Sequence, residues 1–455
     1  MGKSEILDNI LADIGNTPII KLNRLGKVLN ADIFVKVEAL NPGGSSKDRI
    51  ASKMVEEAEK EGALKSGGTI IEATAGNTGV GLALVAAIKG YRCIFVMPDK
   101  MSEDKVSLLR AYGAEVVITP TSVPPDSPES YNGVADRLAR EIPGAFRPNQ
   151  FFNPNNPLAH YLTTGPEIWE IMKGKIDVFV AGMGTGGTIS GTGKYLKEKN
   201  PAIIVIGADP EGSILSGDTP HAYKVEGIGE DFIPRTFNRQ VVDEMVRVSD
   251  KESFNMARRL AREEGILAGG SSGTALAAAI KYAERIPIKK NIVVLLPDTG
   301  RNYLTKIFSD QWMQENGFWE SKIKERTTVD SIFPLKTSTP SIVFVTSAEA
   351  VKNAFDLMHK YNISQIPVID NDKSVGNLQE ATLLKLVYDG VDFANQQVSA
   401  VMGKPLPTID SKTDISEAYR ILLSGANAVI VTENNKPKSI LTRIDLIDFY
   451  TRSKK

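Results

Sequence analysis

The sequence predicts an α/β protein in which a large domain with a mostly parallel sheet precedes a smaller module built from a repeat. Between residues 33 and 298, short β-branched runs alternate with amphipathic helical patterns. Such alternation is typical of a parallel sheet covered by helices on both faces. A second observation is the length: 455 residues are too many for one compact core. The third is an internal similarity after residue 340.

Seven buried strands are expected in the first part of the chain, and we place them at residues 33–37, 69–72, 92–96, 115–118, 177–180, 203–207 and 292–296. An amphipathic helix is expected at 48–61, with Ile50, Met54, Val55 and Ala58 on one face. Because ligands of such sheets bind beyond the carboxyl ends of the strands, glycine-rich segments that follow these strands are candidates for one shared cleft.

The second part of the chain repeats itself. Residues 351–355 and 365–369 resemble residues 415–419 and 427–431, and each unit has the pattern helix, strand, strand, helix. We therefore expect a first domain at 1–319, a polar linker at 320–340, and two repeats at 341–392 and 393–455. The alternative is a single α/β domain with chance similarity.

Composition narrows the function. A net charge of −1 argues against a nucleic-acid-binding surface. No apolar run reaches the roughly 18 residues that cross a bilayer, and the first residues lack a signal-peptide pattern, so we expect a cytoplasmic protein without membrane contact. Cys93 is the one cysteine and the three histidines lack metal-ligand spacing, which predicts no metal site.

Three glycine-rich segments carry candidate chemistry. Residues 41–49 place Lys47 after a tight turn and at the start of a helix. Positive potential at a helix N-terminus favours the neutral amine, and a neutral amine forms a Schiff base with an aldehyde cofactor. Residues 72–79 offer N–H groups, two threonines and an asparagine to a carboxylate, and residues 184–188 offer a phosphate-binding loop. Each segment alone also fits a structural turn.

Neither common nucleotide motif is present. The sequence has no GxxxxGK[ST] and no GxGxxG after the first strand, so nucleotide hydrolysis and dinucleotide binding are poorly supported. A phosphate loop, a separate lysine and a carboxylate loop together fit pyridoxal phosphate chemistry on an amino acid.

These motifs resemble those of the fold-type II pyridoxal-phosphate enzymes, specifically the cysteine synthase and cystathionine β-synthase group. The likeness extends from residue 14 to residue 312 and includes all three segments in the same order. It implies the tryptophan synthase β-like fold, with two subdomains and a parallel or mixed sheet core. It also implies a homodimer or a higher homo-oligomer.

The resemblance assigns roles to individual residues. Lys47 is the Schiff-base lysine and the base, Asn77 hydrogen-bonds the 3′ oxygen of the cofactor, and Ser271 meets the pyridine nitrogen. A neutral serine leaves that nitrogen unprotonated, which favours loss of a β-substituent. The remaining cofactor ligands are Gly184, Thr185, Gly186, Gly187 and Thr188, and the substrate carboxylate site comprises Thr74, Gly76, Thr78 and Gln150.

Several segments and the repeat tail resemble the cystathionine β-synthase branch more than cysteine synthases; the segments are residues 209–214, 225–234 and 301–313. In contrast, residues 163–170 resemble cysteine synthases. The first branch implies β-replacement that condenses L-serine, or an O-acylated serine, with L-homocysteine to cystathionine, with hydrogen sulfide as a side product. A cysteine synthase acting on O-acetylserine and sulfide is the alternative. Ala75 and Phe151 replace a serine and a tyrosine of animal synthases, so the sequence does not decide between serine and an O-acylated serine as the donor.

Two further expectations follow. Animal members carry a haem-binding extension, but the catalytic pattern here begins near residue 15 and no histidine or cysteine precedes Cys93, so we expect no haem. A catalytically silent sensor is a third hypothesis, which the intact Lys47 disfavours.

The tail resembles a pair of CBS motifs, known as a Bateman module. Such pairs often bind adenosine-containing ligands, so S-adenosylmethionine or an adenine nucleotide is a candidate effector. The candidate site comprises Ser364, Gln365, Ile366, Thr442 and Asp445. The alternative is a purely structural dimerisation module.

Overall fold

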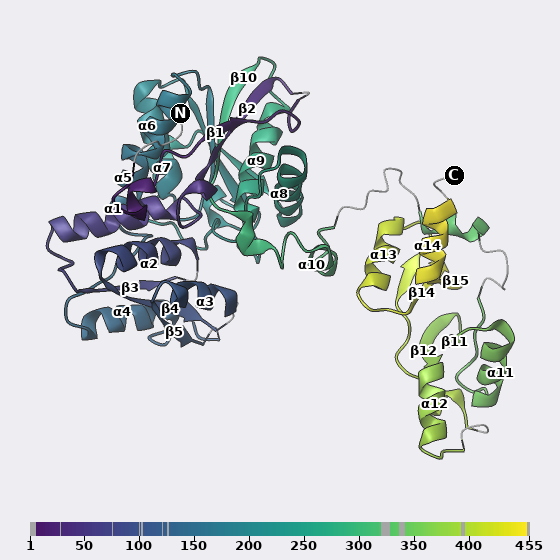
Figure 1. Ribbon diagram of the computed structural model, residues 1–455. Coiled ribbons are helices and arrows are strands. Elements are labelled where there is room, and N and C mark those ends of the chain that lie inside the picture. The colour runs from purple at the N-terminus through teal and green to yellow at the C-terminus, as the bar shows by residue number, and fades with distance from the viewer. Residues whose placement is uncertain are drawn as a thin grey trace. The chain divides into compact units, whose positions relative to one another are not determined.

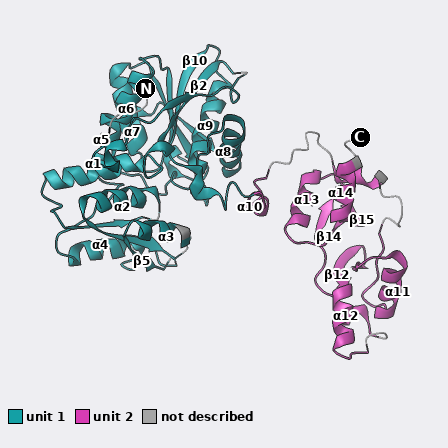
Figure 2. Ribbon diagram, viewed as in Figure 1, with its two compact units in different colours: residues 1–309 teal, residues 310–455 magenta. Residues whose placement is uncertain are grey.

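The computed structural model describes residues 6–27, 29–74, 76–99, 101, 103–120, 122–124, 127–319, 328–335, 342–392 and 396–452. The chain forms two compact units, unit 1 at Met1–Ser309 and unit 2 at Asp310–Lys455 (Figure 2). None of the described helices combines the length and apolar character that crossing a bilayer requires.

Unit 1 contains two sheets (Figure 1). The larger sheet is parallel except at its edge strand β1, and its order is β1 (Ile19–Lys21), β2 (Ala31–Val37), β10 (Lys290–Leu296), β7 (Val178–Gly182), β8 (Ile204–Pro210) and β9 (Glu244–Val248). The smaller sheet is entirely parallel, in the order β5 (Glu115–Thr119), β4 (Arg92–Pro98), β3 (Thr69–Ala73) and β6 (Ala145–Phe146).

Helices cover both faces of the larger sheet because its central strands are apolar on both sides. In β10, Ile292 and Val294 join the core beneath α9 (Gly270–Ala283), whereas Val293 and Leu295 join the core of the opposite face. The remaining helices of unit 1 are α1 (Lys47–Lys60), α2 (Asn77–Lys89), α3 (Glu103–Ala111), α4 (Tyr131–Glu141), α5 (Asn155–Leu162), α6 (Thr164–Ile171), α7 (Gly187–Lys199) and α8 (Asp250–Glu264).

The predicted α/β fold is confirmed, and each of the seven expected strands overlaps an observed one. The sequence analysis missed β1, β6 and β9. β1 and β6 have only 3 and 2 residues, too few for a period-two pattern. β9 is an edge strand whose Arg247 is exposed, so its sequence lacks a continuous apolar run.

Unit 2 contains the predicted repeat. The first half comprises α11 (Val351–Tyr361), β11 (Gln365–Asp370), β12 (Lys373–Gln379) and α12 (Glu380–Tyr388). The second comprises α13 (Ile415–Leu423), β14 (Ala428–Glu433), β15 (Lys436–Thr442) and α14 (Arg443–Arg452), with β13 (Thr408–Asp410) beside β14 and α10 (Asp310–Glu315) ahead of both halves.

Both hairpins of unit 2 use the same turn. Asn371 and Asp372 have φ values of 49° and 60°, and Asn434 and Asn435 have 53° and 63°. Two consecutive left-handed residues of this kind form the type I′ turn that matches the twist of the flanking antiparallel strands. The repeat therefore extends from the sequence pattern to the backbone conformation.

Part of the expected linker is folded. Val329–Leu335 is a 3₁₀ helix, and Val329 and Ile332 are buried in the core of the second repeat with Ile409 and Ile415. Residues 320–327 and 336–340 of that segment lie outside the described residues.

Candidate active site

A cavity of about 160 Å³ lies at the carboxyl ends of strands from both sheets of unit 1. Its walls follow β3, β7 and β10 in the chain, as expected for a ligand site of parallel sheets. The lining residues are Ser46, Lys47, Thr74, Gly76, Asn77, Thr78, Gln150, Phe151, Thr185, Gly227, Ile228, Gly229, Glu230, Ser271, Pro297 and Asp298.

Lys47 is the first residue of α1, and its amine lines the cavity. The preceding turn is fixed because the N–H of Ser46 donates to the carbonyl of Pro297 over 2.8 Å. Burial lowers the pKa of Lys47, against the opposing charges of Asp298 and Glu230. The site therefore favours a neutral, nucleophilic amine.

The predicted carboxylate-binding residues come together at the start of α2. The Thr78 hydroxyl donates to Gln150 Oε1 over 2.6 Å, and Thr74 Oγ1 accepts from the N–H of Gly76 over 3.3 Å. Thr74, Gly76, Thr78 and Gln150 line the cavity beside the N-terminus of α2, a helix of 13 residues. A helix N-terminus attracts an anion. Ala75 lies outside the described residues.

Asn77 has a partner that the sequence analysis missed. Its amide donates to Asp298 Oδ2 over 2.9 Å, and the Tyr303 hydroxyl donates to the same oxygen over 2.7 Å. Burial raises the pKa of Asp298, although these two donors oppose that shift. Asp298 comes shortly after β10, the last strand of the larger sheet along the chain, and this position was the sequence signal that could have identified it as a site residue.

Of the predicted phosphate loop, only Thr185 lines the cavity. Its hydroxyl accepts from Asn156 Nδ2 over 3.1 Å and from the N–H of Gly187 over 3.3 Å. Gly184, Gly186, Gly187 and Thr188 are not among the lining residues. A Cβ on Gly187 would approach Asn156 Oδ1 to 1.8 Å, so the glycine permits close packing of α7 on its neighbour.

The Thr188 hydroxyl has a partner within the protein. It lies 3.1 Å from Nε2 of the buried His160, whose other ring nitrogen lies 2.9 Å from the Thr164 hydroxyl. Burial lowers the pKa of His160 to about 3, which keeps its imidazole neutral. Thr188 thus supports the loop through a neutral hydrogen-bonded chain.

Ser271 is the second residue of α9 and lines the same cavity. Ser46 and Asp298 each keep a buried oxygen with no hydrogen-bond partner among the described residues. Buried oxygens of this kind call for a polar ligand. Together with the amine of Lys47 and the starts of α2 and α9, they fit a group that carries an aldehyde, an aromatic nitrogen and an anionic substituent.

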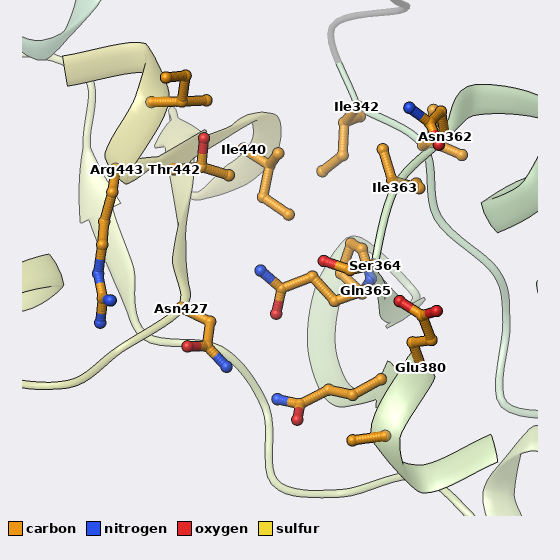
Figure 3. A pocket seen from close by; sticks show the side chains of 15 residues that line it. Ile342, Asn362, Ile363, Ser364, Gln365, Glu380, Asn427, Ile440, Thr442 and Arg443 are labelled. Carbon is orange, nitrogen blue, oxygen red and sulfur yellow. The ribbon is translucent and has the colours of Figure 1, made fainter. Parts of the chain in front are cut away.

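Unit 2 holds a second cavity, of about 700 Å³, between the two repeats (Figure 3). Ser364, Gln365 and Thr442 line it as predicted. Ile366 does not, because the alternation along β11 directs it into the core while Gln365 and Pro367 face the cavity. The Asp445 carboxylate instead accepts from the N–H and the hydroxyl of Thr442, both over 2.7 Å.

The other residues around this second cavity combine apolar and polar groups. Figure 3 shows Ile342 and Ile363 on the side of the first repeat and Ile440 and Asn427 on the other. Glu380 and Arg443 also line it.

Comparisons with known proteins identify the families of both parts of the chain. Residues 10–298 match the family model described as pyridoxal-phosphate dependent enzyme, and residues 332–389 and 398–452 match the CBS domain model. The chain is 42% identical to a cystathionine beta-synthase of Dictyostelium discoideum over 99% of this chain and 94% of the relative. It is 39% identical to that of Saccharomyces cerevisiae, over 97% of both chains.

Solved structures resemble about two thirds of the chain. The O-acetylserine dependent cystathionine beta-synthase from Helicobacter pylori has 43% identity and a TM-score of 0.62, covering 66% of this chain and 98% of that one. A hydrogen sulfide-producing enzyme from Fusobacterium nucleatum has 41% identity and a TM-score of 0.63, with the same coverage.

Proposed function

The chain belongs to the cystathionine beta-synthase family of pyridoxal-phosphate dependent enzymes, and on this basis we propose that it condenses a serine-type donor with L-homocysteine to L-cystathionine. The donor is L-serine or an O-acylated serine. Relatives named cystathionine beta-synthase that match over nearly their full length, and the CBS pair of this chain, favour this reaction over cysteine synthesis. Hydrogen sulfide is released when cysteine takes the place of the donor.

We propose that Lys47, Asn77, Thr185 and Ser271 hold the cofactor, with Gly184, Gly186, Gly187 and Thr188 shaping the loop at its phosphate. Bound pyridoxal phosphate supplies the electron sink that stabilises negative charge at the donor Cα. The neutral hydroxyl of Ser271 at the ring nitrogen limits this sink to loss of a β-substituent.

The other residues of the cavity orient the donor and move its proton. Thr74, Gly76, Thr78 and Gln150 bind the donor carboxylate at the start of α2. Lys47 Nζ removes the Cα proton and returns it after the thiol has added, a role that its lowered pKa supports. Phe151, Ile228 and Pro297 provide the apolar walls that exclude water.

The observation that carries the proposal is the convergence of Lys47, the start of α2 and Gln150 on one small cavity. The test is product analysis with serine plus homocysteine, beside O-acetylserine plus sulfide. We expect cystathionine in the first reaction, and loss of both product and visible absorbance in Lys47→Ala. Lys53→Ala, on the same helix but paired with Glu57, is the control that keeps both. A colourless wild-type protein would contradict the proposal.

We further propose that the second cavity binds an adenosine-containing effector, S-adenosylmethionine or an adenine nucleotide. Its mixed lining suits a ligand with an aromatic base and a polar ribose, and Ser364, Gln365 and Thr442 are the polar contacts. Calorimetry with S-adenosylmethionine, AMP and ATP tests this, with Thr442→Val as the weakened variant. If none of the three gives heat, the pair is a structural dimerisation module.

We also propose that the enzyme is a cytoplasmic homo-oligomer. Its mass in solution, measured by sedimentation, would show a dimer or larger assembly; a monomer would contradict this.

A further inference from the structure

An unpaired carboxyl group shares the cavity of unit 1 with Lys47. Glu230 lines this cavity together with Lys47, and its side chain is half-buried. Among the residues that the structure describes, none forms a hydrogen bond or an ion pair with the Glu230 carboxyl. The binding roles proposed above do not use this group.

The backbone beneath this carboxyl is held firmly. The N–H of Glu230 donates to Ser213 Oγ over 3.1 Å, and its carbonyl accepts from the N–H of Ile214 over 3.0 Å. The N–H of Gly229 donates to the carbonyl of Met183. A fixed backbone with an unpaired side chain is the arrangement of a group positioned for a ligand rather than for the fold.

Burial, together with nearby acidic groups, favours the protonated form of Glu230 near neutral pH. Burial and the nearby carboxyls of Asp231 and Asp209 raise its pKa to about 8, while Lys47 opposes the shift. The hydroxyls of Tyr131 and Tyr223 lie in the same acidic environment, and their own pKa values are raised. A carboxylic acid with this pKa can donate a proton at pH 7.

We propose that Glu230 is the acid that protonates the departing Oγ of free L-serine, so that this enzyme uses serine without prior acylation. This inference rests on the proposed function and concerns the step that differs between the two donors. Hydroxide is a poor leaving group and needs a proton, whereas acetate leaves as a stable anion.

The protons balance over one turnover. Lys47 takes the Cα proton; the Cβ–Oγ bond breaks with its electron pair on Oγ, which takes the proton of Glu230 and leaves as water. The thiol of homocysteine then forms the S–Cβ bond and gives its proton to the Glu230 carboxylate. Lys47 returns its proton to Cα, and both residues regain their starting states.

The experiment compares two donors in the holoenzyme. In Glu230→Gln we expect kcat with L-serine to fall about 100-fold or more, the usual contribution of a general acid, while kcat with O-acetyl-L-serine stays within about threefold. Retained O-acetylserine turnover shows that the variant is folded and loaded. Glu211→Gln, an exposed glutamate nearby in sequence, is the matched control and should leave both rates unchanged.

Two further measurements separate acid catalysis from binding. The dissociation constant of L-serine, from the absorbance change of the holoenzyme, should stay within about twofold in Glu230→Gln. The wild-type rate with serine should decline as pH rises through about 8, and the rate with O-acetylserine should lack this decline.

Three results would overturn the inference. The first is an equal loss of kcat with both donors in Glu230→Gln, and the second is a raised KM for homocysteine in this variant at unchanged kcat. The third is a wild-type enzyme that accepts only O-acetylserine. In the last case the proposed function stands. If the wild type makes cystathionine from neither donor, the proposed function itself fails.

Discussion

The buried ion-pair network behind Lys47 gives a quantitative prediction for Glu38→Gln. Glu38 is fully buried, accepts from Arg49 Nε over 2.7 Å, and accepts from Arg49 Nη2 over 2.9 Å. Arg49 also pairs with Glu167 over 2.6 Å, and Glu167 pairs with Lys36. The network joins the first turn of α1 to α6 and β2, so it helps to hold Lys47 in place.

The pKa of Glu38 sets the magnitude. Burial alone would raise this pKa, but the charges and hydrogen bonds of Arg49, with Lys36 and Thr17, lower it from 4.5 to about 2. At 1.36 kcal/mol per pKa unit, the ionised group stabilises the fold by about 3 kcal/mol at pH 7. Because the pKa is lowered, this stabilisation is present above pH 4.5 and is lost as pH falls toward 2.

We therefore expect Glu38→Gln to lower the free energy of unfolding by about 3 kcal/mol at pH 7, within the range for breaking a buried pair. The difference from wild type should shrink to less than half by about pH 3. Glu263→Gln, which removes an exposed pair with Arg259, is the control and should cost about 0.5 kcal/mol or less.

Urea unfolding gives the free energy of unfolding of both variants. Of the three tryptophans, only Trp169 lies in unit 1, so replacing Trp312 and Trp319 by phenylalanine restricts the fluorescence signal to that unit. A loss below about 1 kcal/mol at pH 7, or a difference that does not narrow on acidification, would refute the reasoning.

Two other predictions concern the support of the active site. Glu72 is buried and accepts from the N–H of Asn149 over 2.6 Å, so Glu72→Ala should displace the neighbouring Gln150 and raise the donor KM about tenfold; an unchanged KM would contradict this. A Cβ on Gly81 would lie 3.0 Å from the Lys47 carbonyl oxygen, so Gly81→Ala should lower kcat. Gly193→Ala is the control, because the three atoms nearest to its Cβ belong to valine side chains at 3.3 Å or more, and its kcat should be unchanged. Equal kcat values in the two variants would count against the prediction.

Local patterns identified the elements and the order of the chemical groups. Strand–helix alternation predicted the sheet strands, and the glycine-rich segments that follow them predicted which loops reach the cavity. The same local patterns did not predict where individual side chains of these loops point. The Thr188 hydroxyl lies beside His160, a neighbour distant in sequence. Ile366 is buried in the core because of the strand register.

The sequence alone determined the α/β architecture, the duplicated tail, and the lysine with its two candidate anion-binding loops, because these depend on periodicity and on motifs within a few residues. The tertiary structure decided which carboxyls share the cavity. Asp298 accepts a hydrogen bond from Asn77 across 221 positions of sequence, and Glu230 lines the same cavity as Lys47 from a loop far along the chain. Their pKa values depend on burial and on charges brought together only by folding.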